Sequence, residues 1–191
     1  MTAHDYTIES LNNDFTLQDG KPDIRPDSII GKAIANNASI KFHSALAPVQ
    51  SDQINILFKN NQLSFALRNP MYKTKSLARS NVSISNLITD NSQMKINIQM
   101  ASQLDNEILE LLDAYNIHLP LSQLKGITKT DLHLVFNLPD FTLSTNGIFT
   151  VDKGDWKGGN ISFQTNGAIV QVEDNLITLD NVELAYKDMV K

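Results

Sequence analysis

Alternation of apolar and polar residues, repeated in many short segments, constrains the fold of this chain more than any other sequence feature. In residues 53–69 (QINILFKNNQLSFALRN) nearly every second side chain is apolar on either side of the polar step Lys59-Asn60-Asn61-Gln62. A period of two places the apolar side chains on one face of a β-strand, and a short polar step between two such runs predicts a hairpin. We therefore predict a hairpin over 53–69 that buries one face.

The same pattern predicts strands at 38–44, 81–88, 93–102 and 131–138. Further short strands are expected after Pro139, because four turn-forming steps divide that region: Asn146-Gly147, Asn166-Gly167, Asp174-Asn175 and Asp180-Asn181. Short strands separated by such steps are typical of an antiparallel meander.

Two regions depart from this pattern. Before residue 37, Gly20, Pro22, Pro26 and Gly31 are expected to interrupt any long element, so only a short strand or two with loops is predicted. In residues 102–117 the period changes, because apolar residues recur at i, i+4, i+7, i+8 and i+11 from Leu104. This stripe predicts one amphipathic helix at about 103–116, with Ser102 and Asp105 resembling a capping box.

The predicted fold class is mainly β (α+β): an antiparallel curved sheet or open β-groove of repeated hairpins with one amphipathic helix near 103–116. About ten strands carry one apolar face each, and a helix of about four turns covers only part of that area. Either a second sheet covers the remainder, as in a sandwich, or the apolar face stays open, and a large open apolar face usually binds something. The 191 residues fit one domain, or one piece of a longer protein.

Composition and spacing argue against several functional classes. A net charge of −5 without basic blocks argues against nucleic acid as a partner, and the absence of cysteine excludes disulfides, thiolate nucleophiles and cysteine metal sites. No two of the four histidines have the spacing of metal ligands, and Glu107 and Glu110 fit a solvated helix face better than an acid–base pair. No phosphate-binding loop or serine elbow is present, so no metal, cofactor or catalytic residue is predicted.

The order of motifs resembles a known family. The runs are INILFKNNQLSFALRNPMYKTKSLARSNVSISNLI (54–88), LKGITKTDLHLVFNLP (124–139) and NGIFTVDKGDWKGGNISFQTNGAIVQVEDNLITLDNVELAYKD (146–188), with the helix between the first two. This succession of hairpin, strand, helix, "LxLxFxLP" strand and further hairpins resembles the AsmA-like proteins, TamB-related proteins of the bacterial envelope, and most closely the central region of YhdP-type chains. The likeness covers about 51–188, and residues 1–50 match it less clearly.

The resemblance implies a function and a location. Proteins of this kind are anchored in the inner membrane by an N-terminal helix, extend through the periplasm, and are implicated in moving phospholipids between inner and outer membranes along an open apolar groove. Residues 1–191 would then be one β-groove segment of a longer protein. Its expected partners are phospholipid or fatty acyl chains and neighbouring β-segments of the full-length chain, with dimerisation through exposed edge strands when the segment is isolated.

Ten apolar residues are candidates to line or support such a groove: Leu63, Phe65, Leu67, Ile96, Ile98, Leu132, Leu134, Phe136, Ile148 and Ile161. The alternative function is a structural or interaction β-module with a closed core and no lipid ligand. An enzyme would require a polar cleft that the linear pattern does not indicate, so no enzymatic activity is expected.

Overall fold

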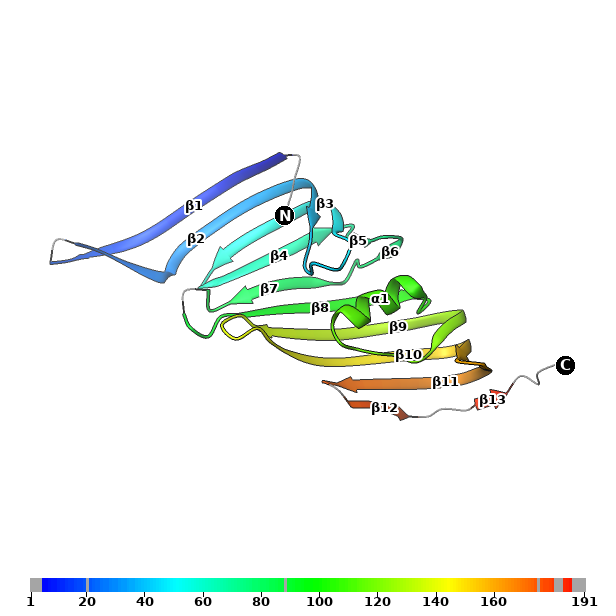
Figure 1. Cartoon of the computed structure of the whole chain (residues 1–191). Helices are drawn as coiled ribbons and strands as arrows, with labels where there is room; N and C mark the ends of the chain where they lie inside the picture. The colour runs from blue at the N-terminus through cyan, green and yellow to red at the C-terminus, as the bar shows by residue number, and fades with distance from the viewer. Residues whose placement is uncertain (1–4, 20, 88, 175, 181–183, 187–191) are drawn as a thin grey trace.

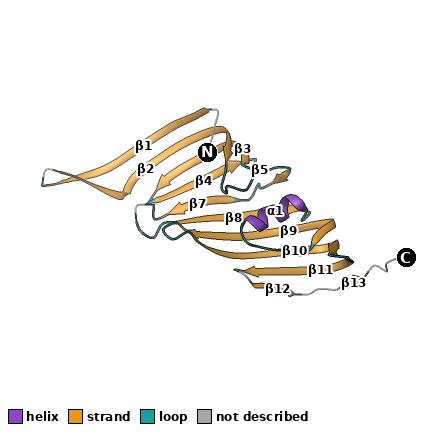
Figure 2. Ribbon diagram, viewed as in Figure 1, coloured by secondary structure: helices purple, strands orange, loops and turns teal. Residues whose placement is uncertain are grey.

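The structure is a computed structural model that describes residues 5–19, 21–87, 89–174, 176–180 and 184–186. The 13 strands in these ranges belong to one antiparallel sheet that is open, with β1 at one end and β12 at the other (Figures 1 and 2). The main path runs β1-β2-β3-β4-β7-β8-β9-β10-β11-β12. The predicted fold class is confirmed, and the described residues contain no second sheet layer.

The strands follow the chain in simple order, so most neighbours in sequence are neighbours in the sheet. Their bounds are β1 Asp5–Gln18, β2 Lys21–Ile40, β3 Val49–Lys59, β4 Gln62–Arg68, β5 Met71–Tyr72, β6 Lys75–Ser76, β7 Asn81–Ser85, β8 Gln93–Ser102, β9 Ser122–Asn137, β10 Thr142–Gly158, β11 Ile161–Glu173, β12 Leu176–Asp180 and β13 Leu184–Tyr186. β13 pairs with β11 beside β12, and the small β5–β6 hairpin branches from β3.

The β3–β4 hairpin confirms the clearest sequence prediction. Lys59 pairs with Gln62, and the two residues between them, Asn60 and Asn61, have φ angles of 52° and 58°. A two-residue turn with both φ values positive matches the twist of an antiparallel pair, and asparagine tolerates that conformation better than most residues.

The prediction of short, interrupted strands before residue 37 was wrong, because β1 and β2 form one long hairpin, in which β2, with 20 residues, is the longest described strand. Pairing between β2 and β3 begins at Gly31, so the preceding part of β2 projects past β3 and has a partner on one side only. Pro26 lies where the β1–β2 register shifts between Asn13 and Phe15. A proline, which lacks an N–H, is tolerated at such an edge or irregularity.

Two of the predicted turns were also wrong. Asn146-Gly147 and Asn166-Gly167 lie inside β10 and β11, which therefore run unbroken where four shorter strands were expected. Gly147 is needed for packing: a Cβ there would lie 2.8 Å from Cδ1 of Leu132. Asp174, with φ of 49°, does turn the chain after β11, whereas Asn175 and Asn181 lie outside the described residues.

The helix α1, Asn106–Ala114, lies within the predicted range in the connection between β8 and β9. Its N-cap is Asp105, whose side chain accepts a hydrogen bond from the Glu107 amide. The predicted cap at Ser102 was wrong, since that hydroxyl donates to the Gln103 carbonyl instead. The buried residues Ile108, Leu111 and Leu112 attach one face of α1 to the sheet.

The two faces of the sheet differ in chemistry. The apolar face, toward α1, carries Ile96 and Ile98 of β8 beside Leu134 and Leu132 of β9. The polar face carries the intervening residues, among them Asn97 and His133, whose side chains are hydrogen-bonded to each other at 2.7 Å. Such alternation is expected of a sheet covered on one side only.

Candidate functional site

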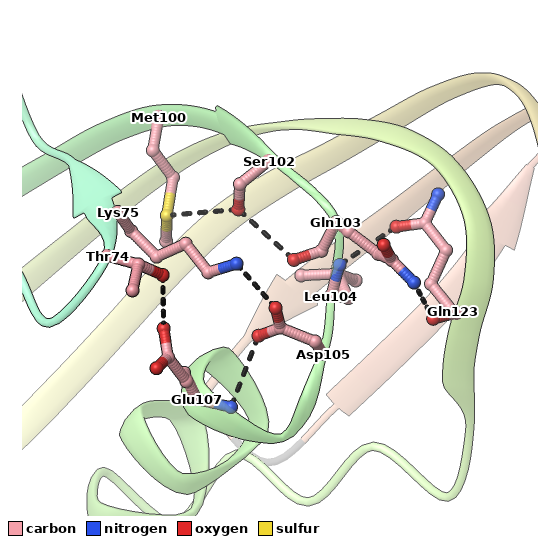
Figure 3. A network of polar contacts seen from close by, with 9 residues as sticks. All are labelled: Thr74, Lys75, Met100, Ser102, Gln103, Leu104, Asp105, Glu107 and Gln123. Atoms are coloured by element: carbon pink, nitrogen blue, oxygen red, sulfur yellow. Dashed lines mark hydrogen bonds and ion pairs between the residues drawn. The ribbon is translucent and has the colours of Figure 1, made fainter.

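The β5–β6 hairpin holds helix α1 against one end of the strands. Lys75 forms an ion pair with Asp105, and the Thr74 hydroxyl donates to Oε2 of Glu107 at 2.7 Å (Figure 3). Lys73, at the tip of the same hairpin, lies 2.6 Å from Oε2 of Glu110. The acidic side of the helix is therefore bound by two lysines and a hydroxyl from one short hairpin.

A second set of contacts joins the helix to β9. Oε1 of Gln123 accepts hydrogen bonds from the Leu104 amide at 2.9 Å and the Thr128 hydroxyl at 2.8 Å. The Gln103 side chain donates to the Gln123 carbonyl at 2.6 Å (Figure 3). Because hydrogen bonds fix the start of α1 on both sides, the helix has a defined place on the apolar face.

Helix α1 is completed by loops on either side. Phe42, Leu46 and Ala47 come from the connection between β2 and β3, and Leu119 and Leu121 from the connection between α1 and β9. We call α1 with residues 41–48 and 115–121 the cover. It lies at the end of the strands where β8 leads into α1, and none of the described residues forms a helix over the opposite strand ends (Figure 1).

Next to the cover, half-buried apolar side chains form a continuous row across six neighbouring strands, and the cover reaches the row where the rings of Tyr115 and Phe136 pack edge to face. Each member is paired with the next in the register of the sheet, and we call the row the apolar strip: Phe58, Leu63, Ile84, Met94, Phe136 and Leu143. At the usual strand spacing it is about 24 Å long and runs across the strands.

The apolar face continues from the strip onto the edge hairpin. Gly31 pairs with both Phe58 and Leu11, and a Cβ at Gly31 would lie 3.8 Å from the Phe58 Cβ and 3.5 Å from Cδ1 of Leu11, so all three share a face. Leu11 is 73% exposed, and Tyr6 and Ile8 on the same strand are similarly open. Large apolar side chains exposed together in this way usually mark a binding surface.

Under the cover lies a cavity of about 50 Å³ whose lining includes no Asp, Glu, Lys or Arg. Tyr72 and Tyr115 line it together with Val82, Ile96 and Leu111. Burial, with a smaller contribution from Tyr72, raises the pKa of Tyr115 to about 12, and burial also raises the pKa of Tyr72. The interior beneath the cover is therefore apolar enough to disfavour a charged phenolate.

Nine of the ten candidate residues lie on the apolar face. Leu63 and Phe136 belong to the strip itself, and the six next to it are Phe65, Leu67, Ile96, Ile98, Leu132 and Leu134. Ile148 lies on the polar face, between the buried Gly147 and Phe149 and opposite Asp131. Ile161, the ninth residue on the apolar face, begins β11, pairs with Gly158 and is 55% exposed, away from the strip.

Four strip residues were not among the candidates: Phe58, Ile84, Met94 and Leu143. The signal was present for three of them, because Phe58, Ile84 and Met94 each lie two residues along the strand from another apolar residue of the same face, as Met94 does from Ile96, whereas Leu143 has Thr145 at that position. What was missing was the pairing register, which places these residues of six separate strands in one row.

Two other features are absent from the described part of the chain. It contains no group of three or more His, Cys, Asp or Glu side chains arranged to hold a metal ion. Within the same residues no helix has the length and apolar character needed to cross a membrane.

Comparison with known protein families identifies a match. The family model described as "YhdP protein" matches residues 2–188, nearly the whole chain, including residues 2–50. No curated protein and no solved structure is significantly similar to the chain.

Proposed function

Because this chain belongs to the YhdP family, a family of the bacterial envelope, we propose that it is a non-enzymatic, lipid-carrying segment. In this proposal phospholipid or fatty acyl chains lie on the apolar strip while they move between the inner and outer membranes. The observation that carries the proposal is the unbroken row of half-buried apolar side chains from Phe58 to Leu143 across six strands.

The direction of the strip supports transport better than static binding. Each methylene removed from water contributes about 0.8 kcal/mol, so a chain that buries ten of them gains roughly 8 kcal/mol. Since Leu63, Ile84 and Met94 offer similar contacts strand after strand, a hydrocarbon chain can move along the row without returning to water. No precisely placed polar group is required for this task.

The open side of the sheet leaves room for the polar end of a lipid. The strip has no second sheet opposite it among the described residues, so a head group can stay in solvent while the acyl chain is bound. On the polar face, Gln99 is hydrogen-bonded to Asp131 and Asn97 to Asn81 and His133, so these polar side chains are largely occupied by one another. The apolar face is therefore the better candidate for a lipid.

Location and partners follow from the same proposal. The segment would lie in the periplasm as part of a protein anchored in the inner membrane, with further β-segments extending the sheet. In the described residues β1 pairs only with β2, and β12 pairs only with β11, so each has one open edge. An open edge pairs readily with another strand, either a neighbouring segment or a second copy of an isolated fragment.

A matched pair of lysine substitutions tests the proposal. Phe58→Lys places a charge in the strip, and Leu57→Lys places the same charge on the other face of the same strand, where Leu57 pairs with Ser64. Saturable binding of a fluorescent phospholipid by the delipidated protein is expected to be lost in Phe58→Lys and retained in Leu57→Lys. Equal binding by both variants, or none by the unaltered chain, would contradict the proposal.

The alternative, an interaction module with a closed core, has less support. It needs the apolar side chains to be packed internally, whereas Leu11 is largely exposed and the strip is only half-buried. Native mass spectrometry of the purified chain separates the two functions, because co-purified lipid is expected only for the lipid-carrying segment.

A further inference from the structure

We propose that the cavity under the cover is a binding site for the methyl-terminated end of a hydrocarbon chain whose remainder lies on the strip. This inference rests on the proposed function and adds to it a defined binding site for the end of the hydrocarbon chain. The cavity is the closed end of the apolar face, and a bound chain would enter it from the strip.

The connection between strip and cavity follows from one strand. Along β8, Met94 belongs to the strip, Ile96 lines the cavity, and Ile98 lines it one step further under the cover. All three side chains share a face because they are two residues apart. On β4, Leu63 and Leu67 bear the same relation, the first in the strip and the second at the cavity.

The lining selects a hydrocarbon rather than a polar ligand. Leu67, Leu77, Val82 and Leu111 surround the space, and no Asp, Glu, Lys or Arg contributes to it. The wall also includes His43, Ser80, Asn81, Tyr72 and Tyr115, but most of it is apolar, so the space favours a small apolar group over a charged one. A head group would have to lose its water there without gaining a charged partner, which is costly.

The volume limits what can enter. About 50 Å³ is roughly a third of the engineered apolar cavity that takes benzene, so only the last few carbons of a chain fit. A whole phospholipid is excluded. The structure thus assigns the cavity to a chain end, and the strip to the carbons nearer the head group.

Filling the cavity tests the assignment. Ala47, half-buried, lines the cavity from the 41–48 loop, and Ala47→Val adds two methyl groups there. Ala66→Val makes the same change at an exposed position of β4, on the polar face, and is the matched control. Val82→Ile is a second filling variant, in case the loop rearranges around the larger side chain, and it adds one methyl group from the sheet.

The probes are two palmitic acid analogues that carry a photoreactive diazirine, one near the methyl end and one at mid-chain. After irradiation, peptide mass spectrometry is expected to find the terminal label on cavity residues such as Val82 and Leu111, and the mid-chain label on strip residues such as Met94 and Phe136. The two added methyl groups of Ala47→Val displace about two carbons of the bound acyl chain from the cavity. Labelling of the cavity by the terminal probe is therefore expected to fall roughly tenfold, while labelling of the strip is retained. Ala66→Val is expected to change neither.

The outcomes separate this inference from the proposed function. Mid-chain labelling of the strip with terminal labelling elsewhere, or cavity labelling unchanged in both filling variants, overturns the cavity site and leaves the lipid-carrying strip intact. Absence of label from both strip and cavity overturns both.

Discussion

Two cross-strand pairs on the same two strands show how differently the apolar face is used. Ile98 and Leu132 are paired between β8 and β9 beneath the cover, and they are 6% and 0% exposed. Met94 and Phe136 are paired in the same way four residues further along the strands, and both remain half-buried. The residue types are similar, so the strands themselves do not decide which pair becomes core.

The difference comes from the connection between β8 and β9. Its residues fold back as helix α1, and the β5–β6 hairpin binds the helix through Asp105, Glu107 and Glu110. The helix is nine residues long, which is enough to cover one end of the strands and not the other. A short insertion thus divides one uniform face into a folding core and an available surface.

The largest expected effect tests this division with one substitution made on each side. Leu132→Ala removes a fully buried side chain, and it is expected to lower the free energy of unfolding by about 3 kcal/mol. Leu143→Ala, on the adjacent strand in the strip, is expected to cost about 1 kcal/mol because water already reaches that side chain. Urea denaturation followed by circular dichroism measures both. Equal losses would mean that the strip is packed as tightly as the core.

The alternation of residues in the sequence was sufficient to predict that the sheet has an apolar and a polar face. It was not sufficient to predict which part of the apolar face is covered and which part stays open. The asparagines of the β3–β4 turn were recognised because two positive φ angles leave few residues that fit. Asn146-Gly147 has the same composition as a turn, but Gly147 is required by close contact with Leu132 of another strand. A local pattern carries no information about such a long-range contact.

For the candidate site, individual residues were predicted from the sequence, but the row that they form was not. Leu63 and Phe136 were identified, because alternation places them on the apolar face, but the row that joins them depends on register across six strands. Ile148 was assigned to the wrong face of the sheet, because a turn was expected at Asn146-Gly147 and the alternation of apolar and polar residues was not followed through it. Once β10 is continuous, the buried neighbours Gly147 and Phe149 put Ile148 on the polar face.

A pH titration tests whether water is excluded from the side chains beneath the cover. Burial raises the pKa of Tyr115 from 10.0 to about 12, so the folded chain keeps this proton at pH values where the unfolded chain releases it. The resulting stability is fully present below pH 10 and is lost as pH rises from 10 to about 12, a change of roughly 2 kcal/mol. Tyr115→Phe is expected to flatten this part of the profile, and to leave stability near pH 7 little changed.

Urea midpoints measured between pH 8 and about 12 give the comparison. Tyr72 remains in the variant, and since burial raises its pKa as well, some alkaline slope is expected to persist. An unchanged slope in Tyr115→Phe would show that water reaches the phenol despite the cover.

Loosening the cover should make the covered end resemble the strip. Asp105→Ala removes the helix N-cap and the partner of Lys75, and is expected to cost about 1 kcal/mol. Hydrogen exchange should accelerate mainly in the amides of α1, while those of β9 and β10 stay protected. Asp105→Asn is the control, because an asparagine can still cap the helix without the ion pair. Equal acceleration in both variants would assign the effect to the ion pair alone.

The smallest expected effect concerns the polar face, at the one candidate that lies there. Ile148 is 46% exposed and pairs with Asp131, so Ile148→Thr keeps a β-branched side chain, removes little packing, and should change stability by less than about 0.5 kcal/mol. Phe136→Thr, on the strip, is expected to reduce binding of the fluorescent phospholipid, whereas Ile148→Thr is expected to leave it unchanged. A loss of binding in Ile148→Thr would place the lipid on the polar face, because threonine at this position alters no side chain of the strip.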